Sequence, residues 1–142
     1  MSQGKTCLVN VLGHGVDLVD VAEMRRWIED PRDPLIPRCF VQAELDEIGY
    51  GADRVERLAG RFAAKEAVLK ALGGGFGAGV AFTDVVIHRA PGAPPEVHLA
   101  GGAAKSAAAH GVTDWKLSIS HAGGFAMASA LALGPEGQTR DP

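Results

Sequence analysis

Hydrophobic residues around Arg61–Lys70 (RFAAKEAVLK) recur every three or four positions, which is the spacing of one face of an α-helix. The stripe consists of Leu58, Phe62, Leu69 and Leu72, with Ala59, Ala63 and Ala67 beside it. No proline or glycine falls between Arg61 and Ala71, and Gly73 follows as a C-terminal cap. The pattern predicts a long helix that begins near Asp53 and runs through Lys70, followed by a glycine-rich run over Leu72–Gly79.

The N-terminal half predicts a strand and two shorter helices. The strand covers Leu8–Val19, and Gly13 and Gly15 inside it mark a bulge or a close approach to the backbone. Helices follow over Asp20–Glu29 and about Phe40–Ile48. The proline-rich segment between them predicts an extended connector.

Two details of these helices bear on function. Asp17 or Asp20 is the N-cap of the first helix in the simplest interpretation. In the second helix the spacing places apolar residues inward and acidic residues outward. The inward set is Val41, Leu45 and Ile48, and the outward set is Glu44, Asp46 and Glu47.

The C-terminal half changes to the period of two that extended strands have. Expected strands are Val80–His88, Glu96–Leu99, Trp115–Ser120 and Phe125–Leu133, with a short alanine-rich helix at Gly101–His110. The last two strands are joined by Gly123-Gly124 and are expected to pair antiparallel. The fold class predicted is therefore α+β, a mainly antiparallel sheet packed against a long helix.

Composition narrows the class of protein. The 142 residues predict one domain, with a core over about 8–133 and flexible tails at 1–6 and 134–142. With 17 acidic and 14 basic residues, the net charge of −3 gives no reason to expect nucleic acid. No stretch reaches the ~20 apolar residues of a membrane span. Cys7 and Cys39 lack metal-ligand spacing and suggest a reducing compartment, so a cytoplasmic location is expected.

Four polar residues are of the types that bind Mg²⁺ and phosphate. Asp17 lies at the end of a strand, Glu66 and Lys70 lie one turn apart on the long helix, and His121 ends a later strand. Two carboxylates suit Mg²⁺, and a lysine or histidine beside them suits phosphate. The set favours transfer chemistry on a diphosphate ligand. The alternative is an ordinary amphipathic helix, with a Glu66–Lys70 ion pair along the edge of its buried face.

The chain resembles the 4′-phosphopantetheinyl transferases, in their short holo-acyl-carrier-protein synthase branch. Four blocks carry the resemblance, in order and at matching separations across about Gly13 to Ala130. They are Gly15-Val16-Asp17, the block RFAAKEA from Arg61 with Lys70, Gly92-Ala93-Pro94, and Ser118-Ile119-Ser120-His121. The second block is the most specific of the four.

The resemblance implies an enzyme of fatty-acid or lipid metabolism that moves phosphopantetheine from coenzyme A to a serine of an acyl carrier protein, releasing adenosine 3′,5′-bisphosphate. By position, Asp17 and Glu66 would ligate Mg²⁺, or Mn²⁺ in its place. Lys70 would contact the diphosphate, and these three residues would form the catalytic set. The expected coenzyme A contacts are Lys70, His121, Ser120, Arg61 and Pro94, with a structural ion pair as the alternative for Arg61.

The resemblance also implies a homotrimer with sites between subunits. The carrier can be of the fatty-acid or polyketide type. One candidate for the base that takes the serine proton is Glu66. The other is Asp46 or Glu44, which would receive the proton through a metal-bound water. The sequence departs from the family pattern at two positions. Glu23 occupies a position that is commonly basic, although Arg25 and Arg26 follow closely. Phe82 occupies a position where tryptophan is frequent.

Two other functions are compatible with the sequence. One is a different Mg²⁺- and diphosphate-dependent transferase, which would prefer another nucleotide to coenzyme A. The other is a non-catalytic module that binds carrier proteins. The presence of Asp17, Glu66, Lys70 and His121 argues against the second.

Overall fold

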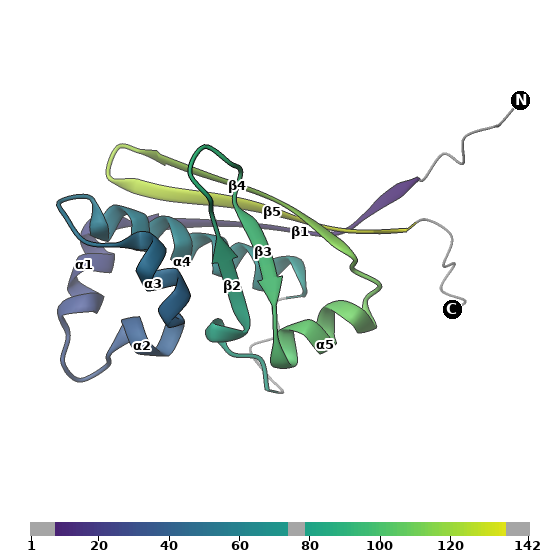
Figure 1. Cartoon of the computed structure of the whole chain (residues 1–142), viewed down its shortest axis with the longest axis horizontal. Coiled ribbons are helices and arrows are strands. Elements are labelled where there is room, and N and C mark those ends of the chain that lie inside the picture. The colour runs from purple at the N-terminus through teal and green to yellow at the C-terminus, as the bar shows by residue number, and fades with distance from the viewer. Residues whose placement is uncertain (1–7, 74–78, 136–142) are drawn as a thin grey trace, which may run out of the picture.

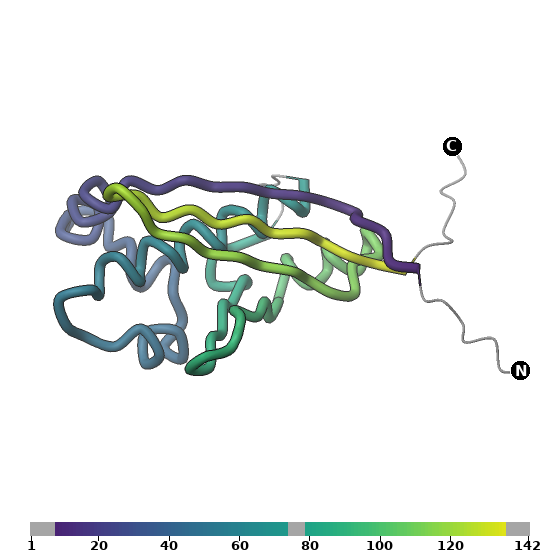
Figure 2. The backbone as a smooth tube through the Cα atoms, turned by 90° about the horizontal axis from the view of Figure 1, so that it is seen from above, coloured from purple at the N-terminus to yellow at the C-terminus, as the bar shows by residue number. Residues whose placement is uncertain are grey.

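The computed structural model describes residues 8–73 and 79–135. Its centre is a three-stranded antiparallel sheet in the order β1-β5-β4, and a single long helix packs along one face (Figure 1). The elements are β1 (Val9–Asp20), β4 (Asp114–Ala122), β5 (Phe125–Pro135) and helix α4 (Arg54–Ala71). Seen from above, the three strands lie side by side along the long axis (Figure 2). The predicted α+β class is confirmed.

Small residues let α4 lie close to the sheet. The side of β5 that faces α4 is lined by Ala126, Ala128, Ala130 and Ala132, all without exposed surface. On β1, a Cβ atom added to Gly15 would lie 1.9 Å from the Ala67 carbonyl oxygen, and one added to Gly13 would lie 2.0 Å from that of Ala71. The register also shifts between Val11 and Gly13. Both expectations for these glycines, a bulge and a close approach, are confirmed.

Three short helices follow β1 and gather at one end of α4 (Figure 1). They are α1 (Val21–Glu29), α2 (Leu35–Cys39) and α3 (Gln42–Ile48). Asp20 is the N-cap of α1, since its Oδ1 accepts from the N–H of Ala22 at 2.9 Å. Asp17 is thus not needed as a cap.

Helix α2 corrects the expectation of an extended connector. Pro37 lies inside its first turn, where a backbone N–H has no partner within the helix, so a missing N–H costs nothing there.

The segment after the glycine-rich run forms a hairpin that packs beside α4. It consists of β2 (Val85–His88) and β3 (Glu96–Leu99), and helix α5 (Gly101–Ala109) leads from it to β4. The predicted strand over Val80–His88 is partly wrong, because Phe82–Asp84 is a 3₁₀ turn, η1. The Asp84 carboxylate accepts from the Ala81 N–H at 3.1 Å and so stabilises a turn in place of a strand.

Strand β5 runs two residues further than expected, to Pro135, because its end pairs with Val9 of β1. In the core, Phe82 stacks on Phe62 with ring centroids 5.5 Å apart. Among residues 8–73 and 79–135, no helix is long and apolar enough to cross a membrane.

Candidate active site

Asp17 and Lys70 meet where β1 runs beside the C-terminal half of α4. The Lys70 Nζ lies 3.0 Å from Asp17 Oδ1 and also donates to the carbonyl oxygen of Val16 at 3.0 Å. Asp17 points to the helix-facing side of the sheet because it alternates with the outward Val16 and Leu18. Its side chain is 15% exposed and that of Lys70 is 47% exposed, so the pair is open to a ligand.

Glu66 lies one helical turn before Lys70 and belongs to the same cluster. Burial raises the pKa of the Glu66 carboxyl, the nearby charge of Asp17 raises it further, and Lys70 partly opposes both effects. Two carboxylates therefore face one region with only one ammonium to neutralise them. This excess of negative charge, carried by oxygen donors, fits a divalent cation such as Mg²⁺.

No group of three or more His, Cys, Asp or Glu side chains that could hold a metal occurs among the described residues. A cation at Asp17 and Glu66 would therefore need further oxygen ligands from water or substrate. Mg²⁺ is commonly bound in this way, by one or two carboxylates together with phosphate oxygens.

His121 and Arg61 meet at a second place, beside the N-terminal half of α4. His121 Nε2 lies 2.9 Å from the Glu56 carbonyl oxygen, and Gly60 leaves room for its ring, since a Cβ there would approach Nε2 to 2.8 Å. A pocket at this place is lined by Arg57, Gly60, Arg61, Arg89, Ile119 and His121. Its three arginines make it suited to an anion. Gly60 precedes Glu66 by six residues, which at 1.5 Å per residue is about 9 Å along the helix.

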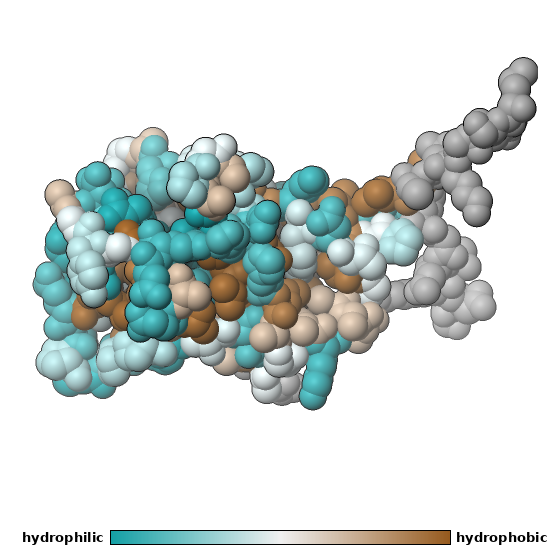
Figure 3. Space-filling model, in the orientation of Figure 1, coloured by the Kyte–Doolittle hydropathy of each residue, from teal (hydrophilic) through white to brown (hydrophobic). Residues whose placement is uncertain are grey.

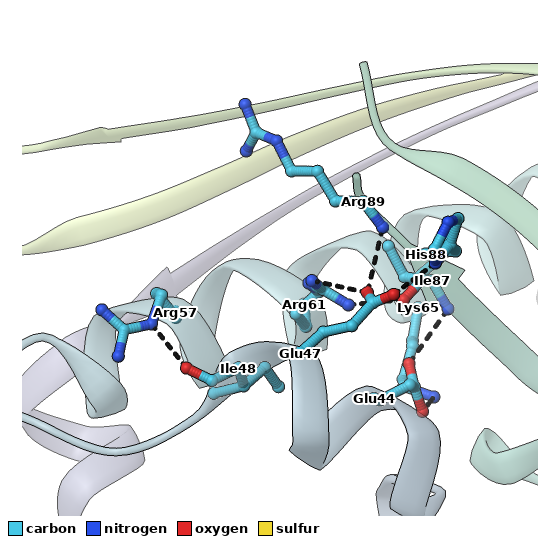
Figure 4. A network of polar contacts seen from close by, with 9 residues as sticks. All are labelled: Glu44, Glu47, Ile48, Arg57, Arg61, Lys65, Ile87, His88 and Arg89. Atoms are coloured by element: carbon cyan, nitrogen blue, oxygen red, sulfur yellow. Dashed lines mark hydrogen bonds and ion pairs between the residues drawn. The ribbon is translucent and has the colours of Figure 1, made fainter. Parts of the chain in front are cut away.

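Arg61 is held by a structural ion pair, the alternative left open above. Its Nη2 lies 3.2 Å from Glu47 Oε1, its Nη1 donates to the Ile87 carbonyl oxygen, and the residue is 7% exposed (Figure 4). Burial raises the pKa of Glu47, but the Arg89 N–H, His88 and Arg61 outweigh this and hold it below its usual value. The side chain of Arg89 points away from this network toward the sheet (Figure 4).

Glu44 does not point outward, so that prediction is wrong. It is 1% exposed and its Oε1 accepts from the Lys65 Nζ at 2.7 Å (Figure 4). Glu44 is therefore removed from the candidate bases, because a buried carboxylate with both oxygens engaged does not reach a substrate. Its spacing gave a usable signal, since it is three residues after Val41 and four before Ile48, on the apolar side of the helix.

Two other predicted site residues lie elsewhere on the chain. Ser120 pairs with Met127 on the outer face of the sheet, opposite to the side on which neighbouring His121 contacts α4. Pro94, in the turn between β2 and β3, borders a groove with Trp115 and Lys116 of β4. The central part of the glycine-rich run, residues 74–78, lies outside the described residues. The sequence did not single out Arg57 and Arg89, which no recognisable block contains.

Comparison with known proteins shows the family of this chain. Residues 13–128 match the family model described as the 4′-phosphopantetheinyl transferase superfamily. The chain belongs to this superfamily. A holo-[acyl-carrier-protein] synthase of Desulforudis audaxviator is 46% identical over 130 residues, covering 92% of this chain and 98% of the relative. The corresponding synthase of Koribacter versatilis is 38% identical over 121 residues, covering 85% of this chain and 97% of the relative.

Solved structures of the family share the fold. The holo-ACP synthase of Plasmodium yoelii superposes with a TM-score of 0.76 at 28% identity, covering 89% of this chain and 98% of the other. The Helicobacter pylori synthase, solved in complex with coenzyme A, gives 0.72 at 28% identity, covering 84% and 98%. The predicted family, fold class and transferase activity are confirmed.

Proposed function

We propose that this chain transfers the 4′-phosphopantetheine group of coenzyme A to a serine of an apo-acyl carrier protein. The observation that carries the proposal is the meeting of Asp17, Glu66 and Lys70 at the junction of β1 and α4, within a chain of this superfamily. The serine oxygen attacks the phosphorus that bears the pantetheine arm. The bond from this phosphorus to the bridging oxygen breaks, adenosine 3′,5′-bisphosphate leaves, and a base takes the serine proton.

The residues of the cluster have separate roles in this proposal. Lys70 donates to the diphosphate and is oriented by Asp17 and the Val16 carbonyl. Asp17 and Glu66 would hold Mg²⁺ or Mn²⁺, which would neutralise charge on the diphosphate. The remaining candidates for the base are Glu66 itself and Asp46, which lies on α3 and accepts from Gln42 Nε2 at 2.8 Å.

The pocket with Arg57, Arg61, Arg89 and His121 is proposed to bind other phosphates of coenzyme A. Since this pocket, Ser120 and Pro94 lie apart in one chain, we propose that two copies of the chain contribute to each complete site. A homotrimer would provide this arrangement.

The outer face of the sheet supports assembly with further copies. It exposes Val16 (43%), Leu18 (61%), Phe125 (43%) and Met127 (44%). Hydrophobic side chains also gather along the end of β1 that extends past the body of the domain (Figure 3). There Val9 and Val11 are 59% and 60% exposed. Association with identical copies would remove this apolar surface from water.

The acceptor proposed is an acyl carrier protein of fatty-acid or polyketide synthesis in the cytoplasm. Arg25 and Arg26 are exposed on α1 and offer positive charge to an acidic carrier, despite Glu23.

The test is the intact mass of an apo-carrier after incubation with the protein, coenzyme A and Mg²⁺. A gain of one phosphopantetheine group that EDTA abolishes supports the reaction and its metal dependence. Absence of a gain with both carrier types, despite coenzyme A binding, would favour the non-catalytic carrier-binding module. Preference for another nucleotide would favour a different diphosphate-using transferase. Transfer rates of Asp17→Ala or Glu66→Ala within a few-fold of wild type would contradict the metal ligands.

A further inference from the structure

Lys65 precedes Glu66 on α4 and is completely buried. Its ammonium has three oxygen partners from three different segments. They are Glu44 Oε1 of α3 at 2.7 Å, the carbonyl oxygen of Phe82 in η1 at 3.2 Å, and the carbonyl oxygen of Val85 at the start of β2. A buried ammonium is costly unless it is paired and hydrogen-bonded, and here all three of its protons find acceptors.

Glu44 completes the connection between these segments. Its Oε1 also accepts from the Val41 N–H at 3.1 Å, and its Oε2 accepts from the Ile87 N–H at 3.0 Å. The Lys65–Glu44 pair thus joins α4, the beginning of α3, and β2 through directional bonds (Figure 4). Together with the bonds of Arg61 to Glu47 and to the Ile87 carbonyl oxygen, these bonds restrain the rotation of α4 about its axis.

Rotation of α4 matters because successive residues of a helix point about 100° apart. The close contacts of Gly13 and Gly15 fix how near α4 lies to β1. The bonds of Lys65 fix which residues then face β1, namely Glu66 and Lys70.

We infer that Lys65 and Glu44 are positioning residues, which hold the rotation of α4 that directs Glu66 and Lys70 toward Asp17. The inference rests on the proposed function, because it gives the cluster its metal- and phosphate-binding role. Lys65 itself touches no substrate, since its ammonium is fully enclosed by protein.

The experiment compares Lys65→Met, the double variant Lys65→Met/Glu44→Gln, and Leu35→Ala. Met keeps the length of the side chain, and Gln removes the buried charge that Lys65→Met alone would leave unpaired. Leu35→Ala is the control for general loss of stability, because Leu35 is buried on α2 away from the cluster. Three quantities are measured for each protein: the melting temperature, Mn²⁺ affinity by electron paramagnetic resonance, and kcat.

We expect Lys65→Met to melt well below wild type and the double variant to regain most of the melting temperature. The double variant should still bind Mn²⁺ about 10-fold more weakly and lose about 10-fold in kcat, as is typical when a group that orients a metal ligand is removed. Leu35→Ala should melt lower while its Mn²⁺ affinity stays within about twofold of wild type, since the cluster is intact.

A double variant with wild-type Mn²⁺ affinity and kcat would overturn the inference and leave the proposed function intact. A wild-type protein that neither binds Mn²⁺ nor transfers phosphopantetheine would overturn the proposed function first. Equal losses of Mn²⁺ affinity in the double variant and in Leu35→Ala would also overturn the inference, because the effect would then be one of stability alone.

Discussion

The Lys70 ammonium lies 3.0 Å from Asp17 Oδ1, although 53 positions separate the two residues in the chain. The contact joins the strand that opens the fold to the end of its longest helix. Lys70→Met should therefore lower kcat for phosphopantetheine transfer about 100-fold, the usual effect of removing a donor to transition-state charge. Steady-state transfer assays check this.

The matched control for this prediction is Lys105→Met, since Lys105 is exposed on α5. It should leave kcat unchanged. Equal activity of the two variants would contradict a role of Lys70 at the diphosphate.

Glu66 predicts a pH dependence of stability. Its pKa in the folded protein lies above the ordinary value of 4.5, so the folded state binds more protons than the unfolded state between the two values. The free energy of unfolding of the metal-free protein should then fall as the pH rises through this interval. Glu66→Gln should remove this fall and raise the melting temperature at pH 7 in EDTA.

Calorimetry in EDTA at a series of pH values upward from the ordinary value of 4.5 tests this effect. Glu56→Gln, at an exposed position of the same helix, should keep the wild-type pH profile. If the curves of Glu66→Gln and wild type ran parallel, the assigned cause would be wrong.

Gly15→Ala should disrupt both stability and activity. The added Cβ would lie 1.9 Å from the Ala67 carbonyl oxygen, so α4 must move away from β1. We expect a loss of about 3 kcal/mol or more in the free energy of unfolding, together with weaker Mn²⁺ binding. Urea denaturation measures the first quantity. Asn10→Ala, at an exposed position of β1, is the control and should change neither.

Arg89 tests the anion pocket without disturbing the fold, because its side chain is exposed and its backbone N–H makes the bond to Glu47. Arg89→Ala should raise KM for coenzyme A about 10-fold, which corresponds to one charge-assisted hydrogen bond. The melting temperature should not change. Arg32→Ala is the control, because the Arg32 side chain is 88% exposed between α1 and α2 and does not line this pocket. This variant should leave KM for coenzyme A unchanged. A wild-type KM for Arg89→Ala would exclude the pocket from coenzyme A binding.

Leu18 tests the proposed trimer. It is 61% exposed on the outer face of the sheet, and Leu18→Lys would bury a charge in the proposed contact between copies. Sedimentation velocity should show trimers for wild type and monomers for the variant, with transfer activity lost in the monomer. Tyr50→Lys, at a position 86% exposed in the loop before α4, should remain trimeric. A monomeric, active wild type would refute the assembly.

Local patterns in the sequence determined most of the secondary structure of this protein and indicated its family. The period of the apolar residues was enough to predict α4 and the β4–β5 hairpin, since each buries one face, and the glycines of β1 marked where α4 would approach. The block around Glu66 was sufficient to indicate the family. These features depend on residues close together in the chain, so the sequence expresses them directly.

Only the tertiary structure decided which side chains are buried and which face of the sheet they occupy, because these depend on contacts between distant segments. Glu44 reads as a solvent-facing acid on its own helix, and only the arrival of Lys65 and Ile87 from distant segments makes its burial favourable. Ser120 and His121 are neighbours in the sequence, yet the alternation of a strand and its packing against α4 put them on opposite faces of the sheet. The spacing of Glu44 places it on the apolar side of its helix, but no local pattern identifies its partners, which lie 21 and 43 positions away. The free energy that makes its burial favourable comes from these contacts, which exist only after folding.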